Sequence, residues 1–577
     1  MAILNDPNDA SRARENDLWI FRDGRKSLPS SSLVQQFRSA AEVVLRSPDD
    51  HGALLDALIR AGELEAALVD SAEPAAAVMI ALTDALASAA FSRDTTALSQ
   101  ELALLASVRL PQSLTISPPE GFSYYALQPL DFGHLAVELV PGNGPVAVIG
   151  IRSIGTTLSA VVMAALRAPG KQAERITVRP TGHPYDRHTR FTPEQQTWIA
   201  ANRGRNAIFL VVDEGPGRSG STFLSVAEAL LEAGIHSRQI RLIGSRAPDP
   251  RLLCAHDAAQ RWSRFQFVFP EHRTSRFKNH FYVAAGEWRR FFLPDGYPWP
   301  GSWTQMERLK FLSPDKTRLF KFEGLGRIGK AVQCRSRRVA EAGFGCPVED
   351  VGDGFSGYVV PTGRALKRDD ISTAMLERMA QYCAFRTREF LCEDAFPEGL
   401  ADMLRFNVAT EFQTELHNDL HQLFPERLTL VDGRMQPYEW LVTTSGTLLK
   451  TDASTHGDDH FFPGPIDIAW DLAGAVVEWN LSPHAIDFLV SRFQALTGDD
   501  PRRRLPIFML AYTVFRMASC KMAITTVAGS TEGTRLRRAY HSYRRRAVEQ
   551  LKAETANPSV ISLPSREPVR RLDTNQP

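Results

Sequence analysis

Hydrophobic and polar residues alternate along the chain in blocks that predict a mixed α/β protein. The clearest block is the continuous apolar run Ile208–Val212, which fits a buried parallel strand because such strands are covered on both faces. Two carboxylates, Asp213 and Glu214, follow directly, then a Gly/Ser/Thr-rich turn and the helical pattern LSVAEALLEAGI. The carboxylates therefore lie at the carboxyl end of the strand, where open α/β sheets bind ligands.

A second unit of the same kind precedes this one. Residues 146–151 are typical of a buried strand and 157–168 of the helix that follows it, with Arg152, Ser153 and Ile154 in the connection. Between the two units, residues 177–191 concentrate cations and show no apolar periodicity. This composition favours a mobile flap that closes over a bound ligand. The flap candidates are Arg179, His183, Asp186, Arg187 and His188. Further strands are expected within 240–248 and 265–270.

This ordered set resembles the type I phosphoribosyltransferases, which bind 5-phosphoribosyl 1-pyrophosphate (PRPP). The resemblance implies that Asp213 and Glu214 hold the ribose hydroxyls and take part in catalysis. It also implies that Arg152, Ser153 and Ile154 form the pyrophosphate loop. The remaining PRPP contacts, with the 5′-phosphate on residues 219–222, would come from Gly217, Arg218, Ser219, Gly220, Ser221 and Thr222. The spacer before Ser219 is one residue longer than in the family, and an ordinary strand–turn–helix is the alternative.

A second pattern occupies the C-terminal half of the chain. Residues 318–326 are typical of a strand ending in glycines, a helix follows, and 353–366 run from a strand into a Pro/Gly-containing hinge. This order resembles the small lobe of kinase-like folds, and aminoglycoside phosphotransferases are the closest match in pattern. The resemblance implies that Lys321 contacts the ATP phosphates and that Val360 and Gly363 of the hinge bind ATP. The helix lacks a central acid, so the usual lysine–glutamate pair has no evident partner.

Two segments compete for the catalytic loop of this kinase-like part. His417–His421 resembles the motif His-Gly-Asp-x-His, but its Asp419 falls in a helical run, 33 residues before Asp452. Spacing instead favours Asp432 near the catalytic-base position, with Glu439 and Asp452 as Mg²⁺ ligands. Farther along, Asp471 in the sequence IAWDLAG matches an aspartate that anchors the loop in this family. A transition-metal cluster is the alternative use of His456, Asp458, Asp459 and His460.

The whole pattern predicts a multidomain chain of α/β and α+β class. We divide its 577 residues into a disordered start (1–16), a helical segment (17–115), a phosphoribosyltransferase-like parallel sheet (116–300), a two-lobed kinase-like domain (301–556) and a disordered tail (557–577). The helical segment, most clearly periodic over 33–108, carries no catalytic cluster. It is interpreted as an accessory or dimerising unit, which makes a homo-oligomer one option.

Composition and charge narrow the setting of the protein. A formal net charge of +1 gives no electrostatic case for a nucleic-acid partner. The six cysteines show no metal-type spacing, and with no signal peptide they favour a cytoplasmic protein with reduced thiols. The apolar stretch 75–91 is interrupted by Asp84 and fits a buried helix, not a membrane span.

Together these patterns predict a bifunctional transferase that acts on small molecules. One site would use PRPP for phosphoribosyl transfer, and the other would use ATP and Mg²⁺ to phosphorylate a nucleoside- or nucleotide-like metabolite. The alternative is a regulatory nucleotide sensor in which one or both domains are catalytically inactive. The missing helix acid, the glutamate at an asparagine position and the longer spacer favour this alternative.

Overall fold

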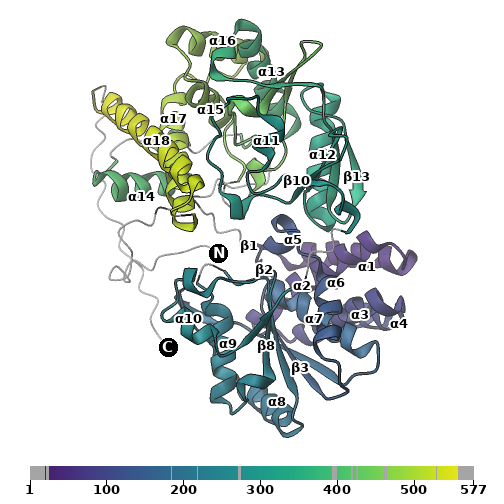
Figure 1. The fold of residues 1–577 in the computed structure, drawn as a ribbon. Helices are drawn as coiled ribbons and strands as arrows, with labels where there is room; N and C mark the ends of the chain where they lie inside the picture. Colours follow the sequence, from purple (N-terminus) through teal and green to yellow (C-terminus); the bar gives the residue numbers. More distant parts are fainter. Residues whose placement is uncertain are drawn as a thin grey trace.

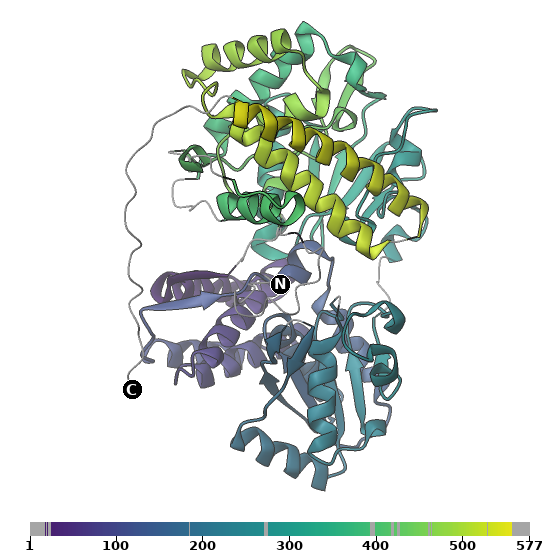
Figure 2. The same ribbon diagram turned by 90° about the vertical axis from the view of Figure 1, so that its left-hand side faces the viewer.

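The protein is described by a computed structural model, which covers residues 18, 20, 25–183, 185–217, 219–270, 275–392, 399–416, 420–423, 427–459, 462, 464–527 and 529–556. Both expected disordered ends, 1–16 and 557–577, lie outside the described residues, as do Arg218, Asp419 and His460. The N-terminal helices and a parallel sheet lie below, and an antiparallel sheet with a larger helical part lies above (Figures 1 and 2).

The helical pattern near the N-terminus forms four helices packed around one apolar core. They are α1 (Ser30–Arg46), α2 (His51–Asp70), α3 (Ala76–Ser92) and α4 (Thr96–Leu105). A small antiparallel pair, β1 (Lys26–Pro29) and β2 (Ser113–Ile116), joins the two ends of this unit. The Asp50 side chain caps α2 by accepting a hydrogen bond from the Ala53 N–H. The unit shares its core with buried residues of α7, so it is packed against the parallel sheet.

The apolar runs in the middle of the chain form a five-stranded parallel sheet in the order β4-β3-β7-β8-β9. Its strands are β3 (Val146–Ile151), β4 (Ala173–Val178), β7 (Ile208–Val212), β8 (Ile240–Ile243) and β9 (Gln266–Val268). The strand order reverses between β3 and β7. In open α/β sheets such a switch point is where ligands bind, outside the carboxyl ends of the strands.

Helices cover this sheet and a hairpin projects from it. The helices are α5 (Glu120–Tyr124), α6 (Pro129–Leu139), α7 (Ile154–Arg167), α8 (Pro193–Gly204), α9 (Ser221–Glu232) and α10 (Ala258–Trp262). The segment expected to be a flap forms the two-stranded hairpin β5 (Thr181–His183) and β6 (Asp186–His188). The hairpin follows β4, so its base starts at the same edge of the sheet as the switch point.

A five-stranded antiparallel sheet in the order β10-β11-β12-β14-β13 follows. Its strands are β10 (Phe281–Tyr282), β11 (Lys310–Leu312), β12 (Arg318–Phe322), β13 (Val348–Gly352) and β14 (Phe355–Val359), with α11 (Trp288–Phe292) between β10 and β11 and α12 (Gly326–Glu341) between β12 and β13. The edge strand β10 lies before the expected boundary at residue 300. Phe277, just ahead of it, stacks on Phe311 of β11 with a ring-centroid distance of 4.7 Å.

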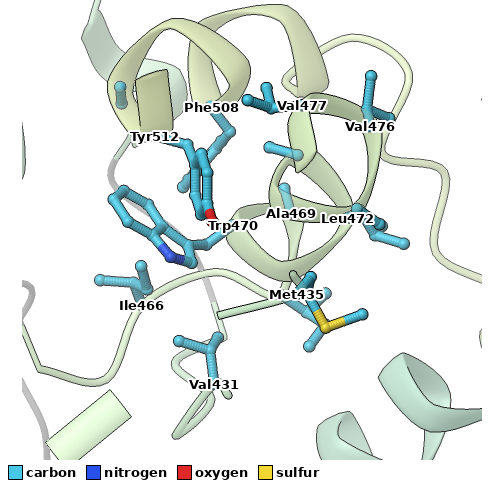
Figure 3. Packing of buried hydrophobic residues seen from close by; sticks show 14 of the residues in the cluster. Val431, Met435, Ile466, Ala469, Trp470, Leu472, Val476, Val477, Phe508 and Tyr512 are labelled. Carbon is cyan, nitrogen blue, oxygen red and sulfur yellow. The ribbon is translucent and has the colours of Figure 1, made fainter. Parts of the chain in front are cut away.

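The remaining chain is mainly helical. It contains the small sheet β15 (Gly363–Ala365), β16 (Trp440–Thr443) and β17 (Leu448–Lys450), and the helices α13 (Thr373–Glu389), α14 (Leu400–Phe412), α15 (Ala469–Trp479), α16 (Pro483–Thr497), α17 (Leu505–Thr526) and α18 (Thr531–Ala556). Trp470 of α15 packs beside Tyr512 and Phe508 of α17, and Val431 and Met435 lie under the same cluster (Figure 3). This core therefore fixes the loop that contains Asp432.

Among the described residues, α17 is the one helix long and apolar enough to cross a bilayer by length and composition. Two thirds of its apolar window (67%) is buried inside the protein. This burial is accounted for by its packing on α15 and α18, as in a core helix.

Candidate functional site

The acidic pair lies where the sheet changes strand order. Asp213 and Glu214 directly follow β7 and are half-buried. Burial raises the pKa of Asp213 to about 7 and the pKa of Glu214 to about 8, with Glu120 and Asp213 adding to the shift of Glu214. Two adjacent carboxyls with such pKa values are poised to bind a cation or to exchange a proton near neutral pH.

The predicted pyrophosphate loop touches the end of the strand that carries these acids. A Cβ on Gly155 would lie 2.5 Å from the carbonyl oxygen of Val212, so only glycine permits this approach. Next to it, Ser153 has φ 103° and ψ −107°. A non-glycine residue held at such a backbone conformation stores strain, which clusters at binding sites. The loop and the acidic pair therefore form one constellation at the switch point.

The glycine/serine turn after the acids leads into α9. Gly220 has φ 69° and precedes the helix, and a Cβ there would lie 2.7 Å from Nε1 of Trp262. The hydroxyls of Ser219 and Ser221 are 2.9 Å apart, and the Ser221 N–H donates to the Ser219 hydroxyl at 3.2 Å. Backbone N–H groups at the start of α9 are directed toward this turn, which suits an anion. Gly217 is exposed, and Thr222 begins the helix beside Ser221.

Arg152 of the predicted loop and Arg179 of the flap are both ion-paired with Asp70, a residue that the sequence does not single out. Asp70, the last residue of α2, binds Arg152 at 2.7 Å and also pairs with Arg179. Arg179 in turn donates to the carbonyl oxygen of Arg152 at 2.9 Å. Asp70 ends an ordinary amphipathic helix, and no local motif marks it. The N-terminal helical unit thus contributes a side chain to this site.

The other flap candidates make contacts within the hairpin. Arg187 donates to the Gly182 carbonyl oxygen at 2.7 Å, and His188 lies 3.7 Å from Asp186. The His183 and Tyr185 rings form an edge-to-face pair with a centroid distance of 5.3 Å. Among the contacts described for the flap candidates, those of Arg179 reach the loop at Arg152.

A cleft of about 320 Å³ lies between the antiparallel sheet and the helical part. It is lined by both charged and apolar residues, among them Lys321, Tyr358, Val360, Arg434, Lys450 and Asp452. Val360, one of the two expected hinge contacts, thus lines the cleft. Gly363 instead pairs with Thr443 in the β15–β16 ladder, and a Cβ there would lie 2.3 Å from the Val442 carbonyl oxygen.

Lys321 and Asp452 meet across the cleft. The Lys321 ammonium is hydrogen-bonded to the Asp452 carboxylate and lies 3.0 Å from the Thr455 hydroxyl. Burial alone would raise the pKa of Asp452, but Lys321, then His456 and Lys310, hold that pKa well below its ordinary value. The strand lysine and the aspartate at the end of the β16–β17 hairpin are thus brought together.

The partner missing from the helix comes from the residue directly after the lysine's strand. Glu323 is fully buried, and its Oε2 lies 3.5 Å from the Lys321 ammonium. The Tyr358 hydroxyl donates to its other oxygen at 2.7 Å. Side chains two positions apart in extended chain lie on the same face. The spacing of Lys321 and Glu323 is therefore the sequence signal that could have revealed this pair. The N-terminus of α12 instead contacts α2, where the Asp56 carboxylate accepts a hydrogen bond from the Arg327 N–H at 2.7 Å.

Asp432 is held in place from several sides. Its carboxylate accepts a hydrogen bond from the Tyr382 hydroxyl at 2.6 Å. The Asp471 carboxylate accepts the N–H groups of Asp432 and Gly433 at 2.8 and 2.9 Å. Burial, then Asp432, raises the pKa of Asp471 to about 6. Asp471 therefore anchors the loop through its backbone, which is the structural role expected of it.

This anchoring predicts a stability effect. Asp471→Ala is expected to lower the free energy of unfolding by about 3–5 kcal/mol, because two buried N–H groups lose a charged acceptor. Urea unfolding followed by circular dichroism measures the change. Asp402→Ala, at an exposed i,i+3 pair on α14, should stay within about 0.5 kcal/mol. Equal losses for the two variants would contradict the anchoring role.

Glu439 is buried beside Asp432 and is ion-paired with Lys450. The Lys450 ammonium lies 3.1 Å from Glu439 and 3.3 Å from Asp432. Burial raises the pKa of Glu439 to about 7, although Lys450 opposes the shift. Single ligand atoms of Asp432, Glu439 and His456 lie within 4.8 Å of one another. Of the alternative metal cluster, His456 lies 3.5 Å from Asp452, and nothing is described for the side chain of Asp458.

One short segment contacts both candidate sites. A Cβ on Gly121 of α5 would lie 3.0 Å from the Glu214 carboxylate. Four residues later, the Tyr125 hydroxyl is 3.5 Å from the sulfur of Met306, which lines the cleft. Burial raises the pKa of Tyr125, and the carboxylates of Glu214 and Asp459 add to the shift. Residues 120–125 thus separate the acidic pair from the cleft.

No family model matches the chain, and no curated protein matches its sequence. Among solved structures, the choline kinase LicA from Streptococcus pneumoniae shows 12% identity and a TM-score of 0.31, covering 43% of this chain and 90% of that one. A choline/ethanolamine kinase family protein from Mesorhizobium loti shows 14% identity and a TM-score of 0.30, covering 43% and 90%.

An aminoglycoside phosphotransferase from Alicyclobacillus acidocaldarius shows 13% identity and a TM-score of 0.24, covering 43% of this chain and 88% of its own. TM-scores this low carry no argument about function. The comparisons thus give a kinase-like resemblance over less than half of the chain, and the functional proposal rests on the contacts described above.

Proposed function

We propose that the cleft of the C-terminal half transfers a phosphoryl group from ATP to a small molecule. The observation that carries this proposal is the meeting of Lys321 and Asp452 across a cleft beside the anchored Asp432. In kinase-like enzymes a strand lysine contacts the ATP phosphates, an aspartate binds metal and a second aspartate orients the acceptor hydroxyl. Lys321, Asp452 and Asp432 are assigned these roles, and Val360 would border the adenine.

The Asp452 carboxylate fits a Mg²⁺ ion. It faces the cleft, and its low pKa keeps it ionised at neutral pH. Mg²⁺ prefers carboxylate oxygens together with substrate phosphates. When bound there, the ion would offset the negative charge that develops on the transferred group. Lys321 would then exchange part of its contact with Asp452 for the phosphates, while Asp432 accepts the hydroxyl proton of the acceptor.

We further propose that the carboxyl edge of the parallel sheet binds PRPP and transfers its phosphoribosyl group. The strained Ser153 loop in contact with the strand that ends in Asp213 and Glu214 supports this function. The acids would hold the ribose hydroxyls, the Ser153 loop the pyrophosphate, and the turn before α9 the 5′-phosphate. Arg152 and Arg179 supply positive charge for the pyrophosphate. The two activities together would make a bifunctional transferase.

Nucleotide sensing is a second candidate for the cleft. The observation that favours it is the burial of the Asp432 carboxylate, which is only 1% exposed and is held by Tyr382 and Lys450. A sensor needs to bind ATP but has no need of an accessible base. Binding and turnover distinguish the two functions.

Calorimetry with ATP·Mg²⁺ and with PRPP·Mg²⁺ tests whether each site binds its ligand. Incubation with a metabolite extract, ATP and PRPP, followed by mass spectrometry, tests turnover. We expect both ligands to bind and new phosphorylated and phosphoribosylated products to form. Binding of ATP without any ATP-dependent product would overturn the transfer function of the cleft and leave the sensor. Failure of PRPP to bind would overturn the proposal for the sheet.

The contact between Asp70 and the two arginines predicts a gain of affinity. Asp70→Asn frees Arg152 and Arg179 for an anion, so PRPP should bind about threefold to tenfold more tightly, as expected for partly exposed ion pairs. Calorimetry gives the affinity. Asp49→Asn removes an exposed ion pair to Arg93 on the same helical unit and should leave the affinity for PRPP unchanged. Weaker binding by Asp70→Asn would show that Asp70 positions the arginines instead of competing for them.

A further inference from the structure

The Lys450 ammonium occupies a closed polar position beside the proposed catalytic loop. Lys450 ends β17 and is two residues before Asp452, and its side chain is 0% exposed. An ammonium has three donors. Here it donates hydrogen bonds to the Thr451 carbonyl oxygen at 2.8 Å and to Glu439 at 3.1 Å, and it is ion-paired with Asp432 at 3.3 Å. The protein itself therefore supplies its partners.

The ammonium is paired with both carboxyl groups. A buried lysine is costly unless it is paired. Glu439 at 3.1 Å and Asp432 at 3.3 Å supply that pairing, and the ammonium lies between them. The protein itself therefore provides the cation at this position.

This arrangement does not fit a second metal ion. Protein kinases hold two Mg²⁺ ions, one on the hairpin aspartate and one on the catalytic-loop asparagine, and Glu439 is at the latter position here. Mg²⁺ requires oxygens at about 2.0–2.1 Å and close to octahedral geometry. The space between Glu439 and Asp432 from which a metal would reach both already contains the ammonium.

We propose that the Lys450 ammonium replaces the second metal ion, so that the phosphotransfer site works with one metal, on Asp452. This inference rests on the proposed ATP-dependent function of the cleft. Lys450 acts as a positioning residue: its ammonium pairs with Glu439 and fixes the position of the Asp432 carboxylate. The phosphates would then contact one metal ion, on Asp452, and the Lys321 ammonium would supply the second positive charge beside them.

Counting bound Mn²⁺ tests the proposal without an acceptor substrate. Electron paramagnetic resonance measures Mn²⁺ bound to the full chain in the presence of a non-hydrolysable ATP analogue. The Asp213→Asn/Glu214→Gln background removes the acidic pair at the sheet. We expect one nucleotide-dependent Mn²⁺ per chain, lost in Asp452→Asn. Lys450→Met should bind two, and adding Glu439→Gln to it should return the number to one.

Two further variants keep the test decisive. Lys310→Met removes a cleft lysine 3.9 Å from Asp452 and should leave the number at one. Glu439→Gln with Lys450 intact should also bind one Mn²⁺ per chain. This variant retains the shape of the site, so it replaces Lys450→Met in the test if that variant fails to fold. Two Mn²⁺ in the parent chain, one of them lost in Glu439→Gln, would overturn the replacement. A folded Lys450→Met that binds a single Mn²⁺ would overturn it too. Failure of the parent to bind the nucleotide would overturn the proposed function itself.

Discussion

Asp452→Asn is expected to slow ATP-dependent phosphoryl transfer by about 1,000-fold, equivalent to about 4 kcal/mol in the activation barrier. The substitution keeps the shape of the side chain but removes the charged ligand proposed for the metal. It also removes the anion that holds the Lys321 ammonium, so the lysine loses its position for the phosphates. Product formation from ATP in the metabolite extract, followed by mass spectrometry, gives the rate.

A neighbouring carboxylate provides the control for this change. Asp459 also lines the cleft but has no assigned contact with metal or phosphate, so Asp459→Asn should retain activity within about threefold. Because Asp452 is half-buried and pairs with the buried Lys321, urea unfolding of each variant must show that the protein is still folded at the assay temperature. Unchanged activity in a folded Asp452→Asn would remove this aspartate from the mechanism.

The sequence carries enough local information to place both proposed sites on their elements. A continuous apolar run identifies β7, so the acids after it must lie at the carboxyl edge of the sheet. Likewise, the spacing from the hairpin turn places Asp452 just past the end of a strand. Both inferences depend on residues close together along the chain, where strand direction and turn length determine the geometry.

The partners of these residues come from distant segments and leave no local signal. Asp70 reaches Arg152 from the end of a helix 82 positions earlier, and no periodicity distinguishes it from other surface acids. Nothing in the sequence around Lys450 marks its contacts with Glu439 and Asp432, which arise from the tertiary fold. The resemblance to kinase-like folds places the partner of the lysine in the helix, whereas Glu323 directly follows the lysine's strand.

The relation between the two sites is likewise a tertiary property. Residues 120–125 carry aromatic side chains and no recognisable site motif. In the structure their backbone lies against Glu214 on one side, and Tyr125 contacts cleft-lining Met306 on the other. Arg308 of the cleft donates to the Ser123 carbonyl oxygen at 3.0 Å. A change in this segment would therefore affect both proposed activities.

The double variant Asp213→Asn/Glu214→Gln is expected to weaken PRPP binding by at least about 100-fold. Each ionised carboxylate would accept a hydrogen bond from a ribose hydroxyl, and a charge-assisted bond contributes about 1.5–3 kcal/mol. Loss of both therefore removes about 3 kcal/mol or more. Calorimetry at constant Mg²⁺ gives the affinity, and ATP binding at the cleft serves as the internal control because Asp452 and Lys321 are unchanged.

The raised pKa values of the pair add a pH dependence with a defined sign. With pKa values of about 7 and 8, both carboxyls are mostly protonated at pH 6, and binding PRPP·Mg²⁺ in the ionised form must then release protons. Affinity should therefore rise between pH 6 and pH 8.5, and this rise should be absent in the double variant. In the free protein the folded state holds these protons more tightly than the unfolded state. The free energy of unfolding should consequently fall as pH rises from about 4 to 8. Affinity that falls over the range from pH 6 to pH 8.5 would show that PRPP binds to the protonated acids, in which case they cannot act as the anionic clamp proposed for the ribose.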